Sequence, residues 1–491
     1  MIAAIDTPHV DWFALSPALA LICVAGALLF VAVLVPRDAR KPVAAFLAFA
    51  GFAASFAFAV VVDDRSANGT TAVHDAIFRD KWSALAQVLL AGAGALAVLI
   101  SYREPMRDEH VAEYYALLAA AGAGMAFFVQ AASLMTLFLG LEWFSISLYV
   151  LTAIDIDLIG SLEAGLKYLI IGAVGSATLL FGSALVYGIT GQLSFDRIAA
   201  AGHGHDVMLV VGLAMIIAGL GFKASAAPFH MWTPDAYQGA PTPVTAFMSS
   251  ATKIAALVVT YRVLVTAFPH DRNLWTGAIA AIAIVSLAWG NIAALLQRNV
   301  KRILAYSSIS HAGFMLIGVA AANALGARAL MYYLIPYAAM SLGAFAVVAA
   351  RERELGAPIT LHNLAGLGWE RPFFGIAMWT FMLGMLGFPL TGGFFGKFYV
   401  FAAAYEAGWW WLIVAGVIAT MISAYYYLGI VRAMYFREAA ELQLAPAGGA
   451  PNPEVLLSAG VLVCVVVTVG SFFAVQPLID LAKHAASALP F

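Results

Sequence analysis

The stretch GLGFKASAAPFHMWTPDAYQGAPTPVTAF, residues 219–247, is apolar at both ends yet contains a lysine, a histidine, an aspartate and four prolines. This composition fits neither a soluble loop nor an uninterrupted membrane helix. A charged side chain at membrane depth costs about 2.5–3.5 kcal/mol on insertion scales, so a chain that keeps one there usually uses it. The segment therefore predicts a broken transmembrane helix in which Lys223 has a function.

The rest of the sequence has the composition of a membrane protein. Of its 491 residues, 63% are hydrophobic and 11% are charged, whereas soluble domains contain about 25% charged residues. Apolar runs long enough to cross a hydrocarbon core of about 30 Å predict an all-α polytopic protein with fourteen transmembrane helices. The runs lie near residues 14–35, 43–62, 82–102, 114–130, 132–152, 161–190, 206–226, 243–267, 274–296, 302–322, 328–350, 372–405, 409–431 and 455–476.

The connections between these runs predict a single membrane domain, because the longest (63–81, 351–371 and 432–454) are too short to form a soluble domain. Lys and Arg are more numerous in the loops that follow odd-numbered apolar runs than in the loops that follow even-numbered runs. The positive-inside rule therefore places those loops in the cytoplasm and both termini on the outer side. A net charge of −2 and the lack of a basic run argue against nucleic-acid binding.

The sequence contains no signature of a cofactor site. Cys23 and Cys464 lie in separate apolar runs without CxxC spacing, which predicts neither an iron–sulfur cluster nor a zinc site. A glycine-rich nucleotide motif is also absent from the sequence. We therefore expect no cofactor or metal in this chain.

A second apolar segment, GMLGFPLTGGFFGKFYVF at 384–401, is also interrupted by proline and glycine and also contains one lysine, Lys397. Paired interruptions indicate an inverted-repeat transporter with its site at the breaks, where protein or water must satisfy the freed backbone groups. We predict two inverted five-helix repeats, spans 4–8 and 9–13, with helices 7 and 12 broken. The predicted boundaries are 1–110 for helices 1–3, 111–268 and 269–433 for the repeats, and 434–491 for a linker and helix 14.

Glu142 lies in LFLGLEWFSISLYV (137–150), with apolar residues on every helical face around it. It must therefore point into the bundle, and Lys223 is the first candidate for its partner. Burial disfavours the charged form of a lysine and a nearby carboxylate favours it. Movement or protonation of Glu142 would thus allow Lys223 to release a proton. The alternative is a static buried ion pair that fixes helix packing.

Two further lysines extend this hypothesis along the chain. Lys253, in FMSSATKIAALVV (247–259), is deep within its run and could receive a proton from Lys223. Lys397, at the second interruption, is the plausible exit gate. The alternative for both is a side chain that snorkels to the membrane interface.

Three other titratable residues permit a structural and a functional interpretation. His230 follows Lys223 by seven residues and could relay protons or simply donate one hydrogen bond. Lys167 lies four residues after Glu163, a spacing typical of a helix ion pair, but it also lies one turn inside the membrane, where it could serve the Lys223 region. Arg262, near the outer end of its run, is expected to be an interfacial anchor.

The segment QRNVKRILAYSSISHAGF (297–314) places Tyr306, three serines and His311 in one run after a cluster of cations. The cations are positive-inside anchors by default. The hydroxyls and the imidazole are too many for a helix that faces lipid. We therefore include Tyr306 and His311 as candidates that line a water chain.

Two of these segments resemble the signatures of the antiporter-like membrane subunits of respiratory complex I (NADH:quinone oxidoreductase). They are GFKASAAPFHMWTPDAYQGAPTPVTAF (221–247) and LLQRNVKRILAYSSISHAG (295–313). The resemblance covers about residues 110–430 strongly. It implies a fourteen-helix fold with one proton channel, in which Glu142, Lys223, Lys253 and Lys397 occupy the positions of the proton-transferring glutamate and lysines.

The resemblance also implies partners and a location. The chain would be a redox-inert subunit of a translocase in the bacterial inner membrane, beside other complex I membrane subunits and their antiporter-like members. NADH, FMN, iron–sulfur clusters and quinone would bind to partner subunits. Two rivals are a subunit of a multi-subunit sodium/proton antiporter, which shares the fold and the lysine motifs, and a scaffold whose buried charges hold its neighbours.

Overall fold

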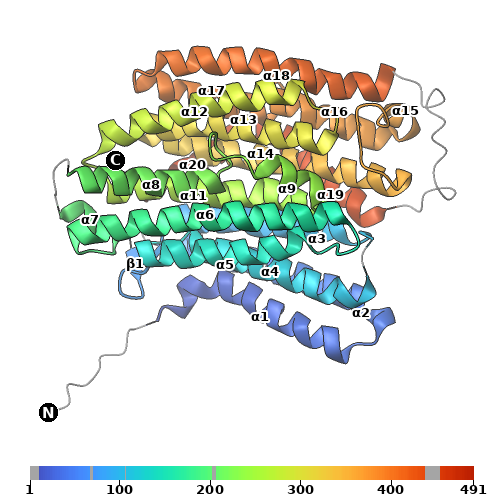
Figure 1. Ribbon diagram of the computed structural model, residues 1–491, viewed down its shortest axis with the longest axis horizontal. Helices are drawn as coiled ribbons and strands as arrows, with labels where there is room; N and C mark the ends of the chain where they lie inside the picture. The colour runs from blue at the N-terminus through green and yellow to red at the C-terminus, as the bar shows by residue number, and fades with distance from the viewer. Residues whose placement is uncertain (1–9, 67–69, 106, 202–205, 437–453) are drawn as a thin grey trace.

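The computed structural model describes residues 10–66, 70–105, 107–201, 206–436 and 454–491. Long helices run side by side across the whole molecule (Figure 1). The start of α1 and the C-terminus lie at the same end of this bundle, at the left of Figure 1. This arrangement is compatible with the prediction that both termini lie on one side of a membrane. Which side this is stays a prediction.

Helices make up nearly all the regular structure, and the strands form only one short antiparallel hairpin, with Thr71 paired to Phe78. The elements are α1 (Trp12–Leu34), α2 (Arg37–Arg65), β1 (Thr70–Ala72), β2 (Ile77–Arg79), α3 (Lys81–Ser101), η1 (Asp108–His110), α4 (Val111–Phe128), α5 (Leu134–Thr152), α6 (Ile159–Thr190), α7 (Phe195–Ala200), α8 (Val207–Lys223), α9 (Thr233–Gly239), α10 (Thr242–Phe247), η2 (Met248–Thr252), α11 (Lys253–Ala267), α12 (Arg272–Leu295), α13 (Val300–Ala321), α14 (Ala324–Leu355), α15 (Leu367–Glu370), α16 (Pro372–Leu386), α17 (Gly392–Glu406), α18 (Trp410–Phe436), α19 (Val455–Phe473) and α20 (Val475–Ala486).

Twelve helices in the described ranges are long and apolar enough to cross a membrane. Two shorter apolar helices, α8 and α16, fall on the predicted helices 7 and 12, and each is followed by a break and a second helix. The prediction of an all-α membrane protein is confirmed. The count of fourteen crossings and the inverted repeats stay predictions. The predicted linker falls largely on residues 437–453, which lie outside the described ranges.

Local sequence explains both breaks. Ser225 adopts a positive φ of 57° directly after α8, and Pro228, which lacks an N–H donor, follows within the break. Gly387 ends α16 in the left-handed conformation, with φ 87°, which glycine adopts without steric cost. In lipid, such interruptions occur only where protein or a water-filled cavity surrounds the backbone. Ala224, Ser225, Ala226 and Ala227 of the first break are buried, whereas Phe388 and Leu390 of the second break are 49% and 57% exposed.

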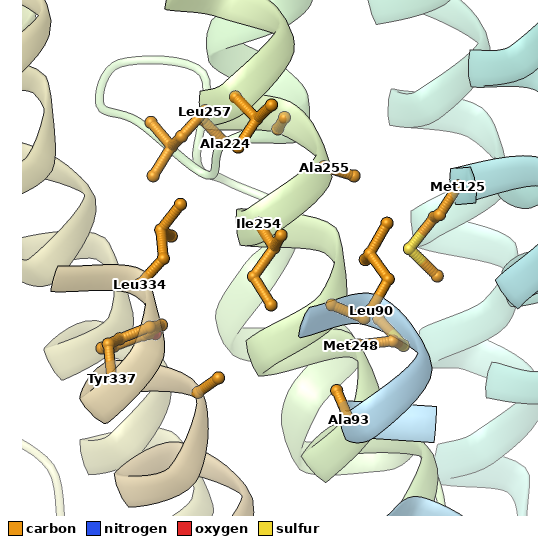
Figure 2. Packing of buried hydrophobic residues seen from close by; sticks show 14 of the residues in the cluster. Leu90, Ala93, Met125, Ala224, Met248, Ile254, Ala255, Leu257, Leu334 and Tyr337 are labelled. Carbon is orange, nitrogen blue, oxygen red and sulfur yellow. The ribbon is translucent and has the colours of Figure 1, made fainter. Parts of the chain in front are cut away.

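The core of the bundle surrounds the continuous span Thr242–Ala267, which is entirely buried, whereas α1 and α6 bury only a narrow face. Figure 2 shows Ile254 of α11 between Leu334 and Tyr337 of α14 on one side and Leu90 of α3 on the other. A helix that is hydrophobic all round belongs in such a core. Any polar group on this span is thus shielded from lipid by protein.

Arg262 corrects one prediction, because it is a buried ion-pair partner and not an interfacial anchor. Its guanidinium contacts both carboxylate oxygens of Asp80, at 2.7 and 2.8 Å, and the hydroxyl of Ser83 at 2.8 Å. Asp80 also caps the N-terminus of α3 by accepting from the Ser83 amide. The sequence could not show this pairing, because 182 residues separate the two side chains.

Arg262→Lys is expected to destabilise the subunit by about 1.5 kcal/mol, because a lysine ammonium cannot reach both Asp80 and Ser83 as the two guanidinium nitrogens do. The matched control is Arg107→Lys, which alters an exposed pair with Asp157 and should have a smaller effect. The midpoint of thermal inactivation in detergent measures both. Equal midpoints for the two variants would contradict the structural role of Arg262.

Candidate functional site

Lys223 ends α8 at the first break and is 1% exposed. Its ammonium lies 5.1–5.4 Å from the centres of four aromatic rings, those of Phe144, Tyr149, Tyr168 and Phe222. Its Nζ makes no hydrogen bond within the described part of the chain. Aromatic faces stabilise a cation weakly, so this lysine is held without a direct counter-ion.

Glu142 is the acid that acts electrostatically on Lys223. Its Oε1 is buried and has no hydrogen-bond partner among the described residues. The two side chains therefore face a common region without forming the direct ion pair that the sequence suggested. A charge pair separated in this way keeps both groups available for proton exchange, whereas a tight bridge would not.

Unpartnered polar atoms gather around this break. The hydroxyls of Tyr149 and Tyr168 and that of Ser225 are buried without a partner in the described structure, as is Nδ1 of His230. Buried polar groups nearly always bind protein or water. Because no protein group satisfies these atoms, the region around Lys223 and His230 is suited to ordered water.

Lys253 is fully buried at the start of α11. Its Nζ donates to the carbonyl oxygen of Ala224, the residue after Lys223, at 2.8 Å. The π-helical turn η2 directly precedes it, and such turns often occur at functional sites. Cations are favoured at helix C-termini, so Lys253 stabilises the end of α8 one residue beyond Lys223.

Lys397 repeats this arrangement at the second break. Its Nζ donates to the carbonyl oxygen of Leu386, the last residue of α16, at 2.9 Å, and to Thr420 at 3.4 Å. It lies 4.3 Å from the centre of the Phe314 ring and is 6% exposed. The alternative of interface snorkelling therefore does not describe Lys253 or Lys397 in this structure.

His311 occupies the space between these lysines, since both Lys253 and Lys397 act on it electrostatically. Its Nδ1 lies 2.9 Å from the Tyr333 hydroxyl and its Nε2 lies 3.0 Å from the Tyr427 hydroxyl. The Tyr427 hydroxyl also contacts Ser307. These bonds form a continuous chain of exchangeable protons.

Tyr306 lies outside this chain, and its hydroxyl makes no hydrogen bond to the described residues. Its neighbour Ser307 belongs to the chain, whereas Ser308 bonds the hydroxyl of Tyr337. Tyr333, Tyr337 and Tyr427 were not predicted from the sequence. Tyrosine is common in apolar helices, so only the contact with His311 distinguishes these three.

Tyr427→Phe is expected to lower proton pumping about tenfold, because it removes the hydroxyl that joins His311 to Ser307. The control is Tyr426→Phe, an adjacent buried tyrosine whose hydroxyl bonds Asn291 instead. Acidification in membrane vesicles measures pumping. Identical rates in the two variants would remove Tyr427 from the path.

Lys167 is placed elsewhere by the structure. Its Nζ contacts Glu163 at 2.7 Å and Asp235 at 3.0 Å, and its side chain is 43% exposed. Asp235 also binds Arg302 at 2.6 Å. This geometry favours the structural interpretation of Lys167, in which it ties α6 to α9 and α13.

Comparison with known proteins identifies the family. Residues 131–423 match the family described as NADH:quinone oxidoreductase/Mrp antiporter, TM. The chain is 44% identical over 366 residues to NADH-quinone oxidoreductase subunit N of Parvibaculum lavamentivorans, covering 74% of this chain and 75% of the relative. It is 38% identical over 472 residues to the same subunit of Paramagnetospirillum magneticum, covering 94% and 95%.

Solved structures agree with this assignment. A chain of respiratory complex I from Thermus thermophilus superposes with a TM-score of 0.79 at 32% identity, covering 95% of this chain and 99% of that one. A chain of the Mrp complex from Dietzia sp. has a TM-score of 0.81 at 22% identity, covering 96% and 97%, which shows a shared fold alone. The sequence PDAYQGAPTPVTAF at residues 234–247 and the position of Lys397 in GFFGKF also favour subunit N within this group of membrane subunits. The chain therefore belongs to the subunit N family of the NADH-quinone oxidoreductases, among the antiporter-like membrane subunits of respiratory complex I.

Proposed function

We propose that this subunit translocates protons through a path of buried side chains and water, coupled to quinone reduction in other subunits. The observation that carries the proposal is that three lysines are buried in the bundle without a hydrogen-bonded carboxylate. Lys223, Lys253 and Lys397 each lack such a partner within the described structure. A structural lysine would be expected to have a paired acid, as Lys167 does.

The order of the groups supports a path across the interior. Glu142 acts on Lys223, Lys253 binds the carbonyl next to Lys223, and His311 interacts with both Lys253 and Lys397. Unpartnered hydroxyls and His230 surround the first break, where water would complete the chain.

The proposal assigns the redox chemistry to partner subunits. No group of three or more His, Cys, Asp or Glu side chains suited to a metal occurs in the described residues. NADH, FMN, iron–sulfur clusters and quinone would bind elsewhere in the complex, beside this chain and its antiporter-like neighbours in the bacterial inner membrane. The relatives' name, NADH-quinone oxidoreductase, supports this assignment.

The first experiment is purification of the tagged protein in mild detergent, followed by an NADH:quinone reductase assay of the material that co-elutes. Reductase activity at large mass is the expected result. An assembly of small membrane proteins without this activity would overturn the proposal and favour the sodium/proton antiporter. A scaffold is distinguished by the lysine variants, which would assemble and pump normally if the charges served packing alone.

A further inference from the structure

A cavity of about 420 Å³ opens at the end of the bundle that carries the Lys- and Arg-rich loops. The connections α3–α4, α5–α6 and α9–α10 form it. Its lining includes Glu104, Arg107, His110, Asp155, Asp157 and Pro241. By the positive-inside rule this end faces the cytoplasm, so cytoplasmic water reaches these side chains.

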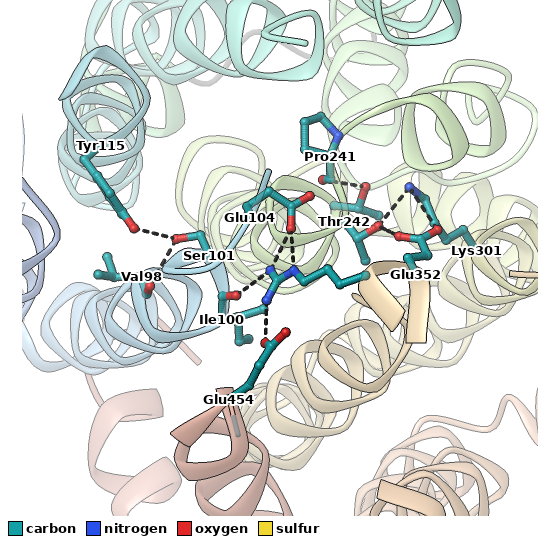
Figure 3. A network of polar contacts seen from close by, with 12 residues as sticks. Val98, Ile100, Ser101, Glu104, Tyr115, Pro241, Thr242, Lys301, Glu352 and Glu454 are labelled. Carbon is teal, nitrogen blue, oxygen red and sulfur yellow. Dashed lines mark hydrogen bonds and ion pairs between the residues drawn. The ribbon is translucent and has the colours of Figure 1, made fainter. Parts of the chain in front are cut away.

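Glu104 connects this cavity to a polar network in the bundle (Figure 3). Arg353 of α14 donates to Oε2 of Glu104 at 2.6 and 3.0 Å and to Oε2 of Glu454 at 2.6 Å. The adjacent Glu352 accepts from the Thr242 hydroxyl. Its carboxylate lies 3.9 Å from the ammonium of Lys301.

This network contains one more carboxylate than cations, so the uptake of one proton would make it neutral. Lys301 and Arg353 contribute two positive charges against the three carboxylates of Glu104, Glu352 and Glu454, which gives a net charge of −1. Protonation of Glu104 would neutralise the group, and Arg353 would keep Glu454 as its counter-ion. Burial raises the pKa of the Glu104 carboxyl, although Arg353 acts in the opposite direction. Proton uptake therefore leaves no buried charge unpaired.

The inner side of the network touches the elements that carry the proposed path. Lys301 donates to the carbonyl oxygen of Ala240 at 2.9 Å and to Thr242 at 3.0 Å. Ala240 is the C-cap of α9, the second half of the first broken helix, and Thr242 begins the span that leads to Lys253. Lys301 was expected from its sequence position to be a membrane anchor, but it is 6% exposed.

We propose that Glu104 is the group that loads protons from cytoplasmic water into this subunit and passes them to the Glu352 carboxylate, which lies beside the Lys301 ammonium. A hydronium ion in the cavity gives its proton to the Glu104 carboxylate and becomes water. Transfer to the Glu352 carboxylate then returns Glu104 to its anionic form. The inference rests on the proposed proton-translocating function, and it adds the entry site to it.

Several charged and titratable groups face Glu104 and set its proton affinity. Arg353 and Lys301 favour the anion, whereas Glu352 disfavours it. Glu454 competes for Arg353. Tyr114 and Tyr115 of α4 lie nearby, and His110 and the acids Asp155 and Asp157 share the cavity.

The test compares Glu104→Gln with Glu454→Gln in the complete complex in membrane vesicles. Both variants remove one carboxylate that binds Arg353 and keep an oxygen acceptor, but only Glu104 lines the cavity. NADH-driven proton pumping and the ratio of protons to electrons are measured from pH 6 to 9. Glu104→Asp is included as a variant that can still carry a proton.

Pumping by the wild type should decline at high pH, because Glu104 is then less often protonated. We expect Glu104→Gln to lower the rate of pumping about fivefold and to abolish this decline. Glu104→Asp should restore both the rate and the decline. Glu454→Gln should keep the decline but shift it to lower pH, because removal of an acid weakens proton binding at Glu104. Unchanged pumping and an unchanged pH profile in Glu104→Gln would overturn the inference. Equal losses in both Gln variants with the wild-type profile would also overturn it, since they would indicate a packing role. If the Lys223→Ala variant pumps protons normally, the proposed function itself is rejected. If Lys223→Ala loses pumping but Glu104→Gln pumps normally, only the role of Glu104 as the entry site is rejected.

Discussion

Replacing Lys223 by alanine is expected to lower proton-coupled NADH:quinone reductase activity about a hundredfold while the complex still assembles. The loss follows from removing a positioned proton-transfer group, which commonly contributes 10²- to 10⁴-fold. Assembly should survive, because the ammonium makes no hydrogen bond within the described structure, so its removal breaks no direct contact. Reductase activity and vesicle acidification, each normalised to assembled complex on a native gel, measure the effect.

Two further variants make this prediction specific. Glu142→Ala should cause a similar loss, since Glu142 is the acid that acts on Lys223. Lys167→Ala is the matched control, because that lysine is 43% exposed and already paired with Glu163 and Asp235. It should keep most of the activity. Normal pumping in assembled Lys223→Ala and Glu142→Ala would refute the channel.

The sequence was a good guide to this fold and to the residues with unusual positions in it. A charge or a proline inside an apolar run is visible without a structure, and this identified Lys223, Lys253 and Lys397 together with both helix breaks. The energetic reason is that lipid cannot satisfy charges or free backbone groups.

Pairings between distant helices did not follow from the sequence. Arg262 looked like an interfacial residue because it lies near a helix end, but the opposite side chain, Asp80, comes from another part of the chain. Lys223 was the first candidate for the partner of Glu142, yet neither Nζ of Lys223 nor Oε1 of Glu142 has a hydrogen-bond partner in the described structure. Tyr427 carried no signal at all, since a tyrosine in an apolar helix is ordinary until a partner such as His311 is known.

The backbone contacts of the lysines were equally hidden. Lys253, Lys301 and Lys397 bind the carbonyl oxygens of Ala224, Ala240 and Leu386, each at the end of a half-helix. The partial negative charge of a helix C-terminus stabilises an ammonium there. At Lys253 and Lys397 this arrangement holds a lysine in the bundle without a hydrogen-bonded carboxylate, because the backbone dipole stabilises the positive charge.

Lys253 tests whether the proton or only the positive charge is needed at this position. Lys253→Ala removes both the charge and the hydrogen bond to Ala224, and we expect about a hundredfold loss of pumping. Lys253→Arg keeps a cation that can bind the carbonyl at the end of α8, but a guanidinium hardly releases its proton. It should therefore lose less, about tenfold, with the remaining flux carried by water around the charge.

The comparison of the two variants separates the possible roles of this residue. If Lys253→Arg matches the wild type, the charge at the end of α8 is sufficient and titration at Lys253 is unnecessary. If it is as inactive as Lys253→Ala, the proton of the lysine is indispensable. The path Lys223, Lys253, His311 and Lys397 requires an intermediate rate of pumping in Lys253→Arg. D₂O should then slow turnover more than in the wild type, because proton transfer has become rate-limiting. Since Lys253 is fully buried beside the first break, a normal rate in both assembled variants would mean that protons do not pass through this part of the bundle.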